Sequence, residues 1–223
     1  MALLSEQDRQ TVRGHLSTLT QPVTLLFFTQ TIDAPETALV ARQILDELVS
    51  LSDRLTLEEV NVVLEQERAA AFGIPGIPAV AVLRNAIDTR IRFLGAPAGY
   101  EFMSLVEAVI LAGTGDSGLS AESRQLIAEH VTGPLDIKVF VTPTCPHCPR
   151  AVTLAHKMAI ENANITATCV EATEFLELSR QYRVTGVPKT IVNGTIEILG
   201  AVPEDTFVRT VVMPEGSQTE SIE

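Results

Sequence analysis

Cysteine, long apolar runs and positive charge are all scarce in this sequence, and each shortage excludes a class of protein. Three cysteines among 223 residues are too few for a small fold held together by disulfides. No run reaches the ~18 apolar residues that a membrane-spanning helix needs, so no membrane association is expected. The 16 basic residues are outnumbered by 28 acidic ones, and both halves of the chain are acidic. Because phosphate binding needs clustered Lys and Arg, a nucleic-acid partner is disfavoured.

The first residues of the chain do not combine a basic segment with a continuous apolar one, so they do not predict a secretory signal. We therefore expect a cytoplasmic protein, in which an isolated cysteine pair is more often catalytic or metal-binding than structural. Apolar residues make up 46% of the sequence, which is enough to form packed cores and excludes wholesale disorder. The length favours two domains of roughly 100 residues each.

Two parts of the chain resemble each other in the same order, which indicates a tandem repeat. Residues 72–80 contain Gly-Ile-Pro, and residues 182–190 contain Gly-Val-Pro at the matching place, 110 positions later. Further matches lie on either side with nearly the same shift: 22–28 with 134–140, and Leu94-Gly95 with Leu199-Gly200. We expect two modules of one fold, at 1–112 and 119–213, joined by a glycine-rich linker at 112–118 and followed by a flexible acidic tail at 214–223.

Each module predicts the same series of elements: helix, strand, helix, strand, short helix, hairpin and closing helix. Strands and helices alternate before a hairpin closes the edge, which indicates an α/β fold with a mixed central sheet flanked by helices. In the first module, helices are expected at 5–19, 35–50, around 65–71 and 99–111, and strands at 23–28, 55–60, 79–84 and 90–94. In the second module, helices are expected at 120–130, 148–162, 173–181 and 203–212, and strands at 135–141, 165–170, 189–192 and 195–199.

The motif Cys145-Pro146-His147-Cys148 follows a predicted strand and opens a predicted helix. We expect Cys145 at the helix N-terminus and Cys148 one turn further in, close enough for the two sulfurs to bond reversibly. Unpaired N–H groups and the helix dipole favour a thiolate there, but the dipole supplies at most ~2 kcal/mol. Lowering a thiol pKa from about 8.5 to about 6 takes roughly 3.4 kcal/mol, so the Cys148 thiol, backbone amides and His147 are expected to contribute the rest.

A zinc site is the alternative interpretation of this cysteine pair. It would usually need a second pair of ligands at suitable spacing, and Cys169, His130 and His156 do not form one. Cys169 lies within an apolar strand, where a buried structural thiol is expected, and His156 is expected to be a surface or packing residue. Redox chemistry at Cys145 and Cys148, without a metal, is therefore favoured.

The strand, the Cys-Pro-His-Cys motif at a helix start, and Gly186-Val187-Pro188 before a hairpin strand together resemble the thioredoxin and glutaredoxin superfamily. Two thioredoxin-like folds in tandem resemble the protein disulfide oxidoreductase family of archaea and bacteria. They also resemble the N-terminal domain of the flavoprotein subunit of alkyl hydroperoxide reductase. Residues 95–102, Gly-Ala-Pro-Ala-Gly-Tyr-Glu-Phe, are similar to a stretch that closes the first module in that family. The resemblance covers nearly the whole chain.

The resemblance implies a role for each residue of these motifs. Cys145 would be the attacking cysteine and Cys148 the resolving one, with Pro146 and His147 between them and His147 tuning the thiolate. Pro188 would be a cis-proline that faces the pair, and the Val187 backbone would pair with an extended substrate strand. The redox-active disulfide is the only cofactor implied.

The first module departs from the family pattern. Residues 29–37 contain no cysteine where a redox pair would fall, although Pro78 occupies the proline position. We expect this module to be a structural platform or a partner-docking surface. Asp33 and Glu36 are better explained as a helix N-cap and a first-turn acid than as catalytic residues.

The resemblance thus implies a thiol–disulfide oxidoreductase that exchanges disulfides with protein substrates. It would receive electrons from an NAD(P)H-dependent flavin disulfide reductase and pass them to a peroxiredoxin or to other protein disulfides. Two alternatives stay open: a protein disulfide oxidase or isomerase, which His147 favours, and a glutaredoxin-like iron–sulfur module ligated by Cys145. Glu171 and Lys138 are both candidates for the proton-transfer group.

Overall fold

The computed structural model describes residues 4–213, and its elements follow the order expected from the sequence. The first half contains helices α1 (Glu6–Leu16), α2 (Glu36–Val49), α3 (Gln66–Ala71) and α4 (Glu101–Thr114), and strands β1 (Val23–Thr29), β2 (Leu55–Asn61), β3 (Ala79–Arg84) and β4 (Ile87–Leu94). The second half contains helices α5 (Ala121–His130), α6 (Cys148–Glu161), α7 (Leu176–Gln181) and α8 (Glu204–Val212), and strands β5 (Leu135–Val141), β6 (Ile165–Glu171), β7 (Lys189–Val192) and β8 (Ile196–Leu199).

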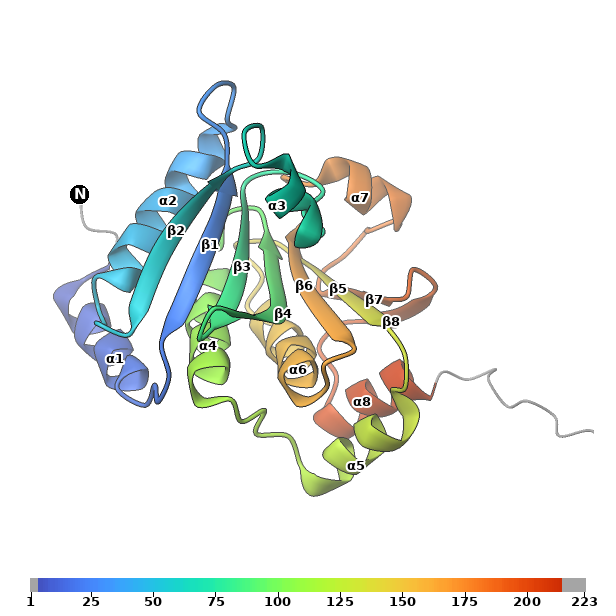
Figure 1. Cartoon of the computed structure of the whole chain (residues 1–223). Helices are drawn as coiled ribbons and strands as arrows, with labels where there is room; N and C mark the ends of the chain where they lie inside the picture. The colour runs from blue at the N-terminus through green and yellow to red at the C-terminus, as the bar shows by residue number, and fades with distance from the viewer. Residues whose placement is uncertain (1–3, 214–223) are drawn as a thin grey trace, which may run out of the picture.

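These strands form one sheet in the order β2-β1-β3-β4-β6-β5-β7-β8 (Figure 1). In the first half β1 is parallel to β2 and antiparallel to β3, and in the second half β5 is parallel to β6 and antiparallel to β7. The α/β class with mixed central sheets is confirmed. The two four-stranded halves are joined because β4 pairs with β6 in parallel, a contact that nothing in the sequence indicated. The predicted module boundaries remain a proposal, and the acidic tail at 214–223 lies outside the described residues.

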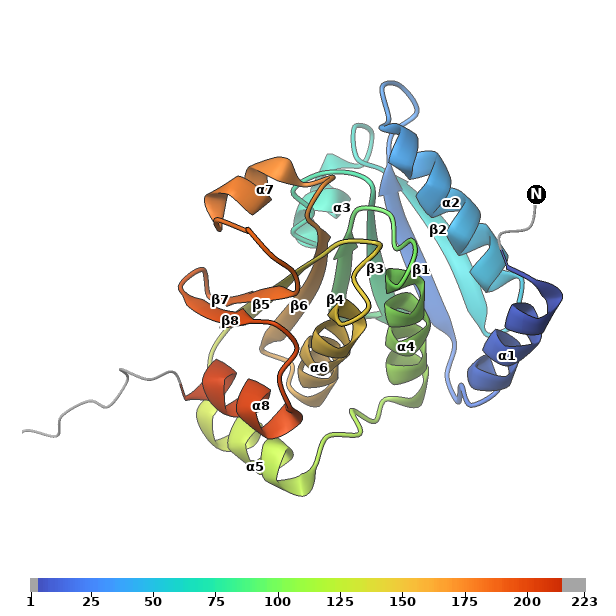
Figure 2. The ribbon, with the colours of Figure 1, turned by 180° about the vertical axis from the view of Figure 1, so that it is seen from behind.

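Helices cover the two faces of the sheet unequally. Figure 2 shows α2, α4 and α6 side by side across one face, and their apolar sides form a continuous core with α1, α5 and α8. The short helices α3 and α7 pack on the other face over a smaller core. Strand β1 is apolar on both sides and almost wholly buried, as expected for a central strand. Within residues 4–213, no helix is long and apolar enough to cross a membrane.

Local signals account for several helix ends. The Ser5 hydroxyl accepts a hydrogen bond from the N–H of Asp8, and the Ser120 hydroxyl accepts one from the N–H of Ser123, each at 3.2 Å. Both serines therefore act as the N-caps of α1 and α5. Pro149 sits in the first turn of α6, where its missing N–H leaves no hydrogen bond unmade.

The predicted linker is shorter than expected, because its first three residues belong to α4. Gly113 packs so closely on Leu19 that an added Cβ would lie 2.3 Å from a methyl group of that side chain. Helix α4 ends at Gly115, which adopts a left-handed φ of 72° and terminates the helix in the way that favours glycine.

Three further expectations were wrong in detail. Asp33 does not cap α2: Pro35 occupies the N-cap position, and Asp33 adopts a left-handed φ of 57° in the preceding loop. Strand β4 begins at residue 87 rather than 90, because the hairpin turn consists only of Asn85 and Ala86, both with positive φ. Helix α7 starts at 176 rather than 173, because the Glu171 carboxylate accepts hydrogen bonds from the Thr173 hydroxyl and the Glu174 N–H and holds these residues in a turn.

A close backbone contact joins the start of α4 to the loop that follows β5. The N–H of Tyr100 donates to the carbonyl oxygen of Pro143 over 3.0 Å. Gly99 has a φ of +60°, and an added Cβ would lie 2.2 Å from the same carbonyl oxygen. Glycine is therefore required at this position both by its backbone conformation and by the space available.

The Gly99→Ala substitution tests this contact. We expect a loss of about 2–4 kcal/mol in the free energy of unfolding, because the methyl group meets backbone that cannot move aside and the left-handed conformation is strained. Gly133→Ala is the matched control, since an added Cβ there would meet nothing within 4 Å and the φ of Gly133 is not left-handed. The control should change the free energy of unfolding by less than about 0.5 kcal/mol in urea titrations. Equal stability of the two variants would contradict the close contact.

Candidate functional site

Cys145 and Cys148 form a disulfide between the end of β5 and the start of α6. A tight turn links Cys145 to the strand, with the N–H of Cys145 donating to the carbonyl of Thr142 over 3.1 Å. Helix α6 begins at Cys148 with His147 as its N-cap, so Cys145 lies just before the helix and Cys148 is its first residue. The predicted start of this helix at residue 148, three residues after Cys145, is confirmed.

The two cysteines differ in exposure and in hydrogen bonding. Cys145 is 7% exposed, whereas Cys148 is fully buried. The backbone N–H of Cys148 donates to Cys145 Sγ over 3.1 Å. A free N–H at a helix start thus points at the sulfur of the outer cysteine, where it would stabilise a thiolate after reduction. Pro146 and His147 are exposed, and the tuning role of His147 remains a prediction.

The Val187–Pro188 peptide bond is cis, as is the equivalent Ile77–Pro78 bond of the first half. Gly200 donates its N–H to the carbonyl of Pro188 and so continues the hairpin on one side. Among residues 4–213, the N–H and carbonyl of Val187 have no hydrogen-bond partner. This short unpaired edge can accept an added strand, which is the role predicted for Val187.

A buried carboxyl group that the sequence reasoning missed lies at the start of α4. Glu101 is 2% exposed, and burial raises its pKa to about 7. One carboxyl oxygen, Oε2, accepts from the Ser104 hydroxyl over 2.6 Å and from the Cys169 thiol over 3.7 Å, while Oε1 is buried with no partner in the described residues. The available signal was its place in the stretch 95–102, Gly-Ala-Pro-Ala-Gly-Tyr-Glu-Phe, which the sequence comparison had marked as similar to the family without giving Glu101 a role.

Glu101 belongs to the first half of the chain but lies beside the redox loop of the second. The preceding residue, Tyr100, is hydrogen-bonded to Pro143, two residues before Cys145, and α4 packs along α6. Cys169, on β6, is the buried thiol that the sequence predicted, and burial together with the Glu101 carboxyl raises its pKa. The site therefore combines sulfur atoms from one half with a titratable carboxyl from the other.

The remaining candidates are engaged by other partners. Burial lowers the pKa of His156 to about 3, and its ring packs edge-on against Phe93 with centroids 5.1 Å apart, so it is the packing residue that was expected. Glu171 is occupied by the turn before α7. Lys138 forms an ion pair with Asp136 on the sheet face that carries α3 and α7, whereas both cysteines belong to the core on the opposite face.

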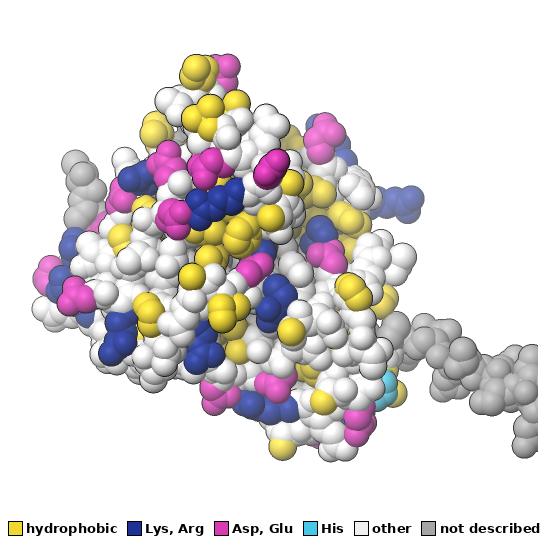
Figure 3. Space-filling model, in the orientation of Figure 1, with side chains coloured by type: hydrophobic (Ala, Val, Ile, Leu, Met, Phe, Trp, Pro, Cys, Tyr) yellow, Lys and Arg dark blue, Asp and Glu magenta, His cyan; other side chains and the backbone are white. Residues whose placement is uncertain are grey.

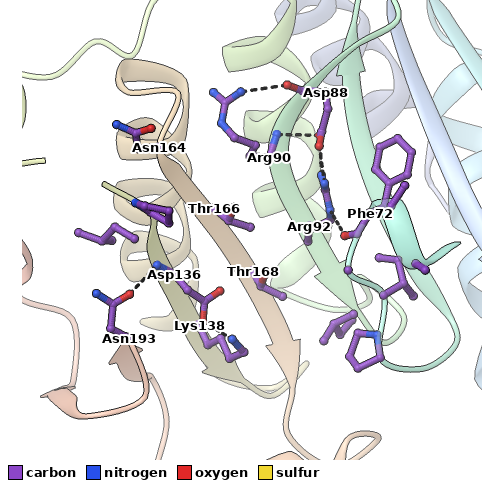
Figure 4. Close-up of a pocket in the computed structure, with 18 residues that line it drawn as sticks. Phe72, Asp88, Arg90, Arg92, Asp136, Lys138, Asn164, Thr166, Thr168 and Asn193 are labelled. Atoms are coloured by element: carbon purple, nitrogen blue, oxygen red, sulfur yellow. Dashed lines mark hydrogen bonds and ion pairs between the residues drawn. The ribbon is translucent and has the colours of Figure 1, made fainter. Parts of the chain in front are cut away.

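That sheet face contains a groove of about 510 Å³ over β4, β6 and β5 (Figure 4). Most of its charged side chains are paired: Arg92 binds Asp88 over 2.5 Å, and Lys138 pairs with Asp136. The Arg90 guanidinium, which also lines the groove, donates to the backbone carbonyls of Asp88, Ala159 and Ile165. Figure 3 shows basic and acidic side chains interspersed across this side of the molecule rather than gathered in a field of one sign. Arg92 and Lys138 are thus engaged by carboxylates and Arg90 by backbone carbonyls, so none of the three cations has its donors free for an anionic ligand.

Comparison with known proteins places the chain among disulfide oxidoreductases. Residues 135–213 match the model of the thioredoxin domain. The AhpF component of alkyl hydroperoxide reductase from Escherichia coli (strain K12) is 27% identical over 192 residues, covering 86% of this chain and 34% of that protein. The chain thus spans about a third of the length of this curated relative.

Two solved structures are similar over almost the whole chain. The NTD_N/C domain of alkylhydroperoxide reductase AhpF from Enterococcus faecalis has a TM-score of 0.86 and 30% identity, covering 93% of this chain and 99% of that one. A protein disulfide oxidoreductase from Aeropyrum pernix has a TM-score of 0.84 and 28% identity, covering 93% and 91%. Because each match covers 93% of this chain, both structures resemble it in the first half, which lacks the cysteine pair, as well as in the second.

The raised pKa of Glu101 predicts how stability depends on pH. Below pH 4.5 the carboxyl is protonated in both the folded and the unfolded chain. As the pH rises to about 7, the unfolded chain ionises first, so the folded state loses about 3 kcal/mol, and the loss levels off at higher pH. The Glu101→Gln variant has no carboxyl at this position, so its free energy of unfolding should not fall in this way as the pH rises.

Urea unfolding of the oxidised protein from pH 4 to pH 8 measures the effect. The stability of Glu101→Gln relative to the unsubstituted protein should rise by about 3 kcal/mol across this range. Glu67→Gln, at an exposed position of α3, is the control. A difference between Glu101→Gln and the unsubstituted protein that stays constant with pH would show that Glu101 is not held neutral by burial.

Proposed function

Since the chain belongs to the family of the N-terminal domain of alkyl hydroperoxide reductase AhpF and the protein disulfide oxidoreductases, we propose that this disulfide oxidoreductase relays electrons from a flavin-dependent disulfide reductase to a peroxiredoxin. The observation that carries the proposal is the Cys145–Cys148 disulfide between a strand and a helix of a thioredoxin domain. The relatives named as components of alkyl hydroperoxide reductase favour reduction of the substrate over its oxidation.

The reaction starts from the reduced dithiol. The Cys145 thiolate attacks one sulfur of the substrate disulfide, forms a mixed disulfide and displaces the other substrate sulfur as a thiolate, which takes up a proton. The Cys148 thiolate then attacks Cys145 Sγ, restores the intramolecular disulfide and releases the second substrate sulfur. Two electrons have passed from the protein dithiol to the substrate, and the NAD(P)H-dependent reductase returns them through the same two sulfurs.

Exposure and hydrogen bonding support this order of attack. Cys145 is the more exposed sulfur and receives the N–H of Cys148, whereas Cys148 is buried. A substrate therefore meets Cys145 first, and Cys148 reacts only from within the protein. His147, exposed at the N-cap of α6, would add to the stabilisation of the thiolate when it is protonated or donates a hydrogen bond.

The buried thiol of Cys148 must lose its proton before it can attack, and Glu101 is the group we assign to accept it. Its pKa of about 7 allows it to take up and release a proton near neutral pH. A solvent-exposed carboxylate would be too weak a base for this step. Because Glu101 comes from the first half of the chain, that half contributes to the chemistry although it lacks cysteines.

Substrate binding is assigned to the unpaired edge at Val187. An extended segment beside the substrate cysteine would pair with the N–H and carbonyl of Val187 and place its sulfur over Cys145. Backbone pairing of this kind accepts many sequences, which suits a protein that acts on protein disulfides.

Variants of the two cysteines test the assignment. We expect Cys145→Ser to reduce the rate of peroxiredoxin disulfide reduction by at least about 10³-fold, because no nucleophile remains at the more accessible of the two cysteine positions. Cys148→Ser should instead accumulate a covalent mixed disulfide, detected by mass spectrometry as a reducible adduct on Cys145. If Cys145→Ser retained the activity, or if the adduct of Cys148→Ser mapped to Cys169, the proposed roles would be refuted.

A further inference from the structure

A groove of about 450 Å³ extends from the unpaired Val187 edge along α7. Its floor is largely apolar and includes Leu176 and Val184, and it begins at Thr142, whose carbonyl anchors Cys145. A substrate segment paired with Val187 would therefore continue into this groove. Two basic residues, Arg180 and Arg183, line it.

Basic side chains outnumber acidic ones around α7, although the whole chain is acidic. The chain has 16 basic and 28 acidic residues, yet residues 176–189 contain three basic residues and one acidic residue. Arg180 makes only a long ion pair of 3.9 Å with the exposed Glu177. Among the described residues, the Arg183 side chain has no ion pair or hydrogen bond. Figure 3 shows basic side chains projecting from the α7 region at the edge of the molecule.

The first half forms the same turn without either arginine. The positions equivalent to Arg180 and Arg183 in the first half are Ala70 and Gly73. Gly73 has a φ of +64° and Arg183 a φ of +49°, so both occupy the same left-handed turn. Glycine adopts this conformation without strain, whereas a residue with a Cβ is strained there. Only the half with the redox pair carries an arginine there.

The turn that presents Arg183 is held rigidly. Lys189 is 4% exposed, pairs with Glu197 over 2.9 Å, and donates to the carbonyls of Tyr182 and Arg183 over 2.8 and 3.4 Å. In the first half, Arg92 donates to the equivalent carbonyl, that of Phe72, over 3.1 Å. Both halves therefore fix the same turn with a buried cation. In the second half, the fixed turn carries a further, unpaired cation at the edge of the groove.

We infer that the groove selects disulfide substrates whose cysteine lies in an extended segment with acidic side chains, bound by Arg180 and Arg183. The inference rests on the proposed function, because it assumes that the segment pairs at Val187 and reacts with Cys145. Charge complementarity over such a short range would speed the productive encounter and disfavour segments rich in lysine. The net charge of −12 repels acidic peptides at long range, so the preference for acidic segments comes only from contacts within the groove.

Three peptides that differ only in the residues flanking a single cysteine test this inference. Each cysteine is activated as a mixed disulfide with the neutral leaving group 2-thiopyridine, and the flanking residues are Glu, Gln or Lys. The fully reduced protein attacks the peptide sulfur, and released thiopyridone gives the second-order rate constant. Measurements at about 0.1 M salt screen charges beyond ~10 Å and retain the local contacts.

We expect the Glu peptide to react about three- to tenfold faster than the Lys peptide, with the Gln peptide between them. The preference should vanish near 1 M salt, where the Debye length is ~3 Å. The Arg180→Gln/Arg183→Gly double variant should bring the ratio of the Glu and Lys rate constants close to one. Its fold should be retained, because glycine fits the left-handed turn. Arg13→Gln, on α1 and away from the groove, is the matched control and should keep the ratio of the unsubstituted protein.

The outcomes separate this inference from the function on which it rests. If the unsubstituted protein attacks all three peptides at equal rates, or if the double variant keeps the full preference, the inference is wrong while the disulfide exchange stands. If none of the peptides reacts with the reduced protein, the proposed function itself fails.

Discussion

The parallel pairing of β4 with β6 is the contact on which the rest of the structure depends. It places Phe93 opposite Cys169 and Leu94 opposite Val170, and so joins two four-stranded sheets into one. Strand β6 is in turn parallel to β5, so the carboxyl ends of all three strands reach the same edge of the sheet. The chain leaves β4 toward α4 at that edge and leaves β5 toward the redox loop. The contact of Tyr100 with Pro143 and the position of Glu101 beside Cys169 both follow from this pairing.

This arrangement brings a carboxyl of the half without cysteines close to the redox loop of the other half. The second half supplies two sulfurs, a helix start that donates an N–H to one of them, and an unpaired strand edge beside Pro188. The first half supplies a carboxyl whose burial brings its pKa to about 7. A carboxyl has this property only when protein covers it on every side, and the packing of α4 on α6 provides that cover.

The sequence predicted the features that depend on local patterns. The order of elements, the cysteine pair at a helix start, the burial of Cys169 and the serine caps all rest on short-range spacing or composition. The β4–β6 pairing was not predictable in the same way, because backbone groups make it and either edge of an apolar strand satisfies the pattern. Glu101 was missed because an acidic residue in a helix is normally solvated, and only tertiary packing decides otherwise. The start of α7 was misplaced because the side chain of Glu171 competes with the helix for backbone N–H groups.

The most direct test of the account is the pH dependence of the reduction potential of the Cys145–Cys148 couple in the unsubstituted protein and in Glu101→Gln. Disulfide reduction consumes two electrons and two protons while both thiols stay protonated. In the oxidised protein the pKa of Glu101 is about 7. A thiolate formed nearby on reduction would raise the pKa of Glu101 further, because the two negative charges repel. Above pH 7, reduction would therefore add a proton to the Glu101 carboxylate, beyond the protons that the thiols take up. We therefore predict that above about pH 7 the potential of the unsubstituted protein falls more steeply with pH than that of the variant. Parallel curves from pH 5 to pH 9 would contradict a redox site shared between the two halves.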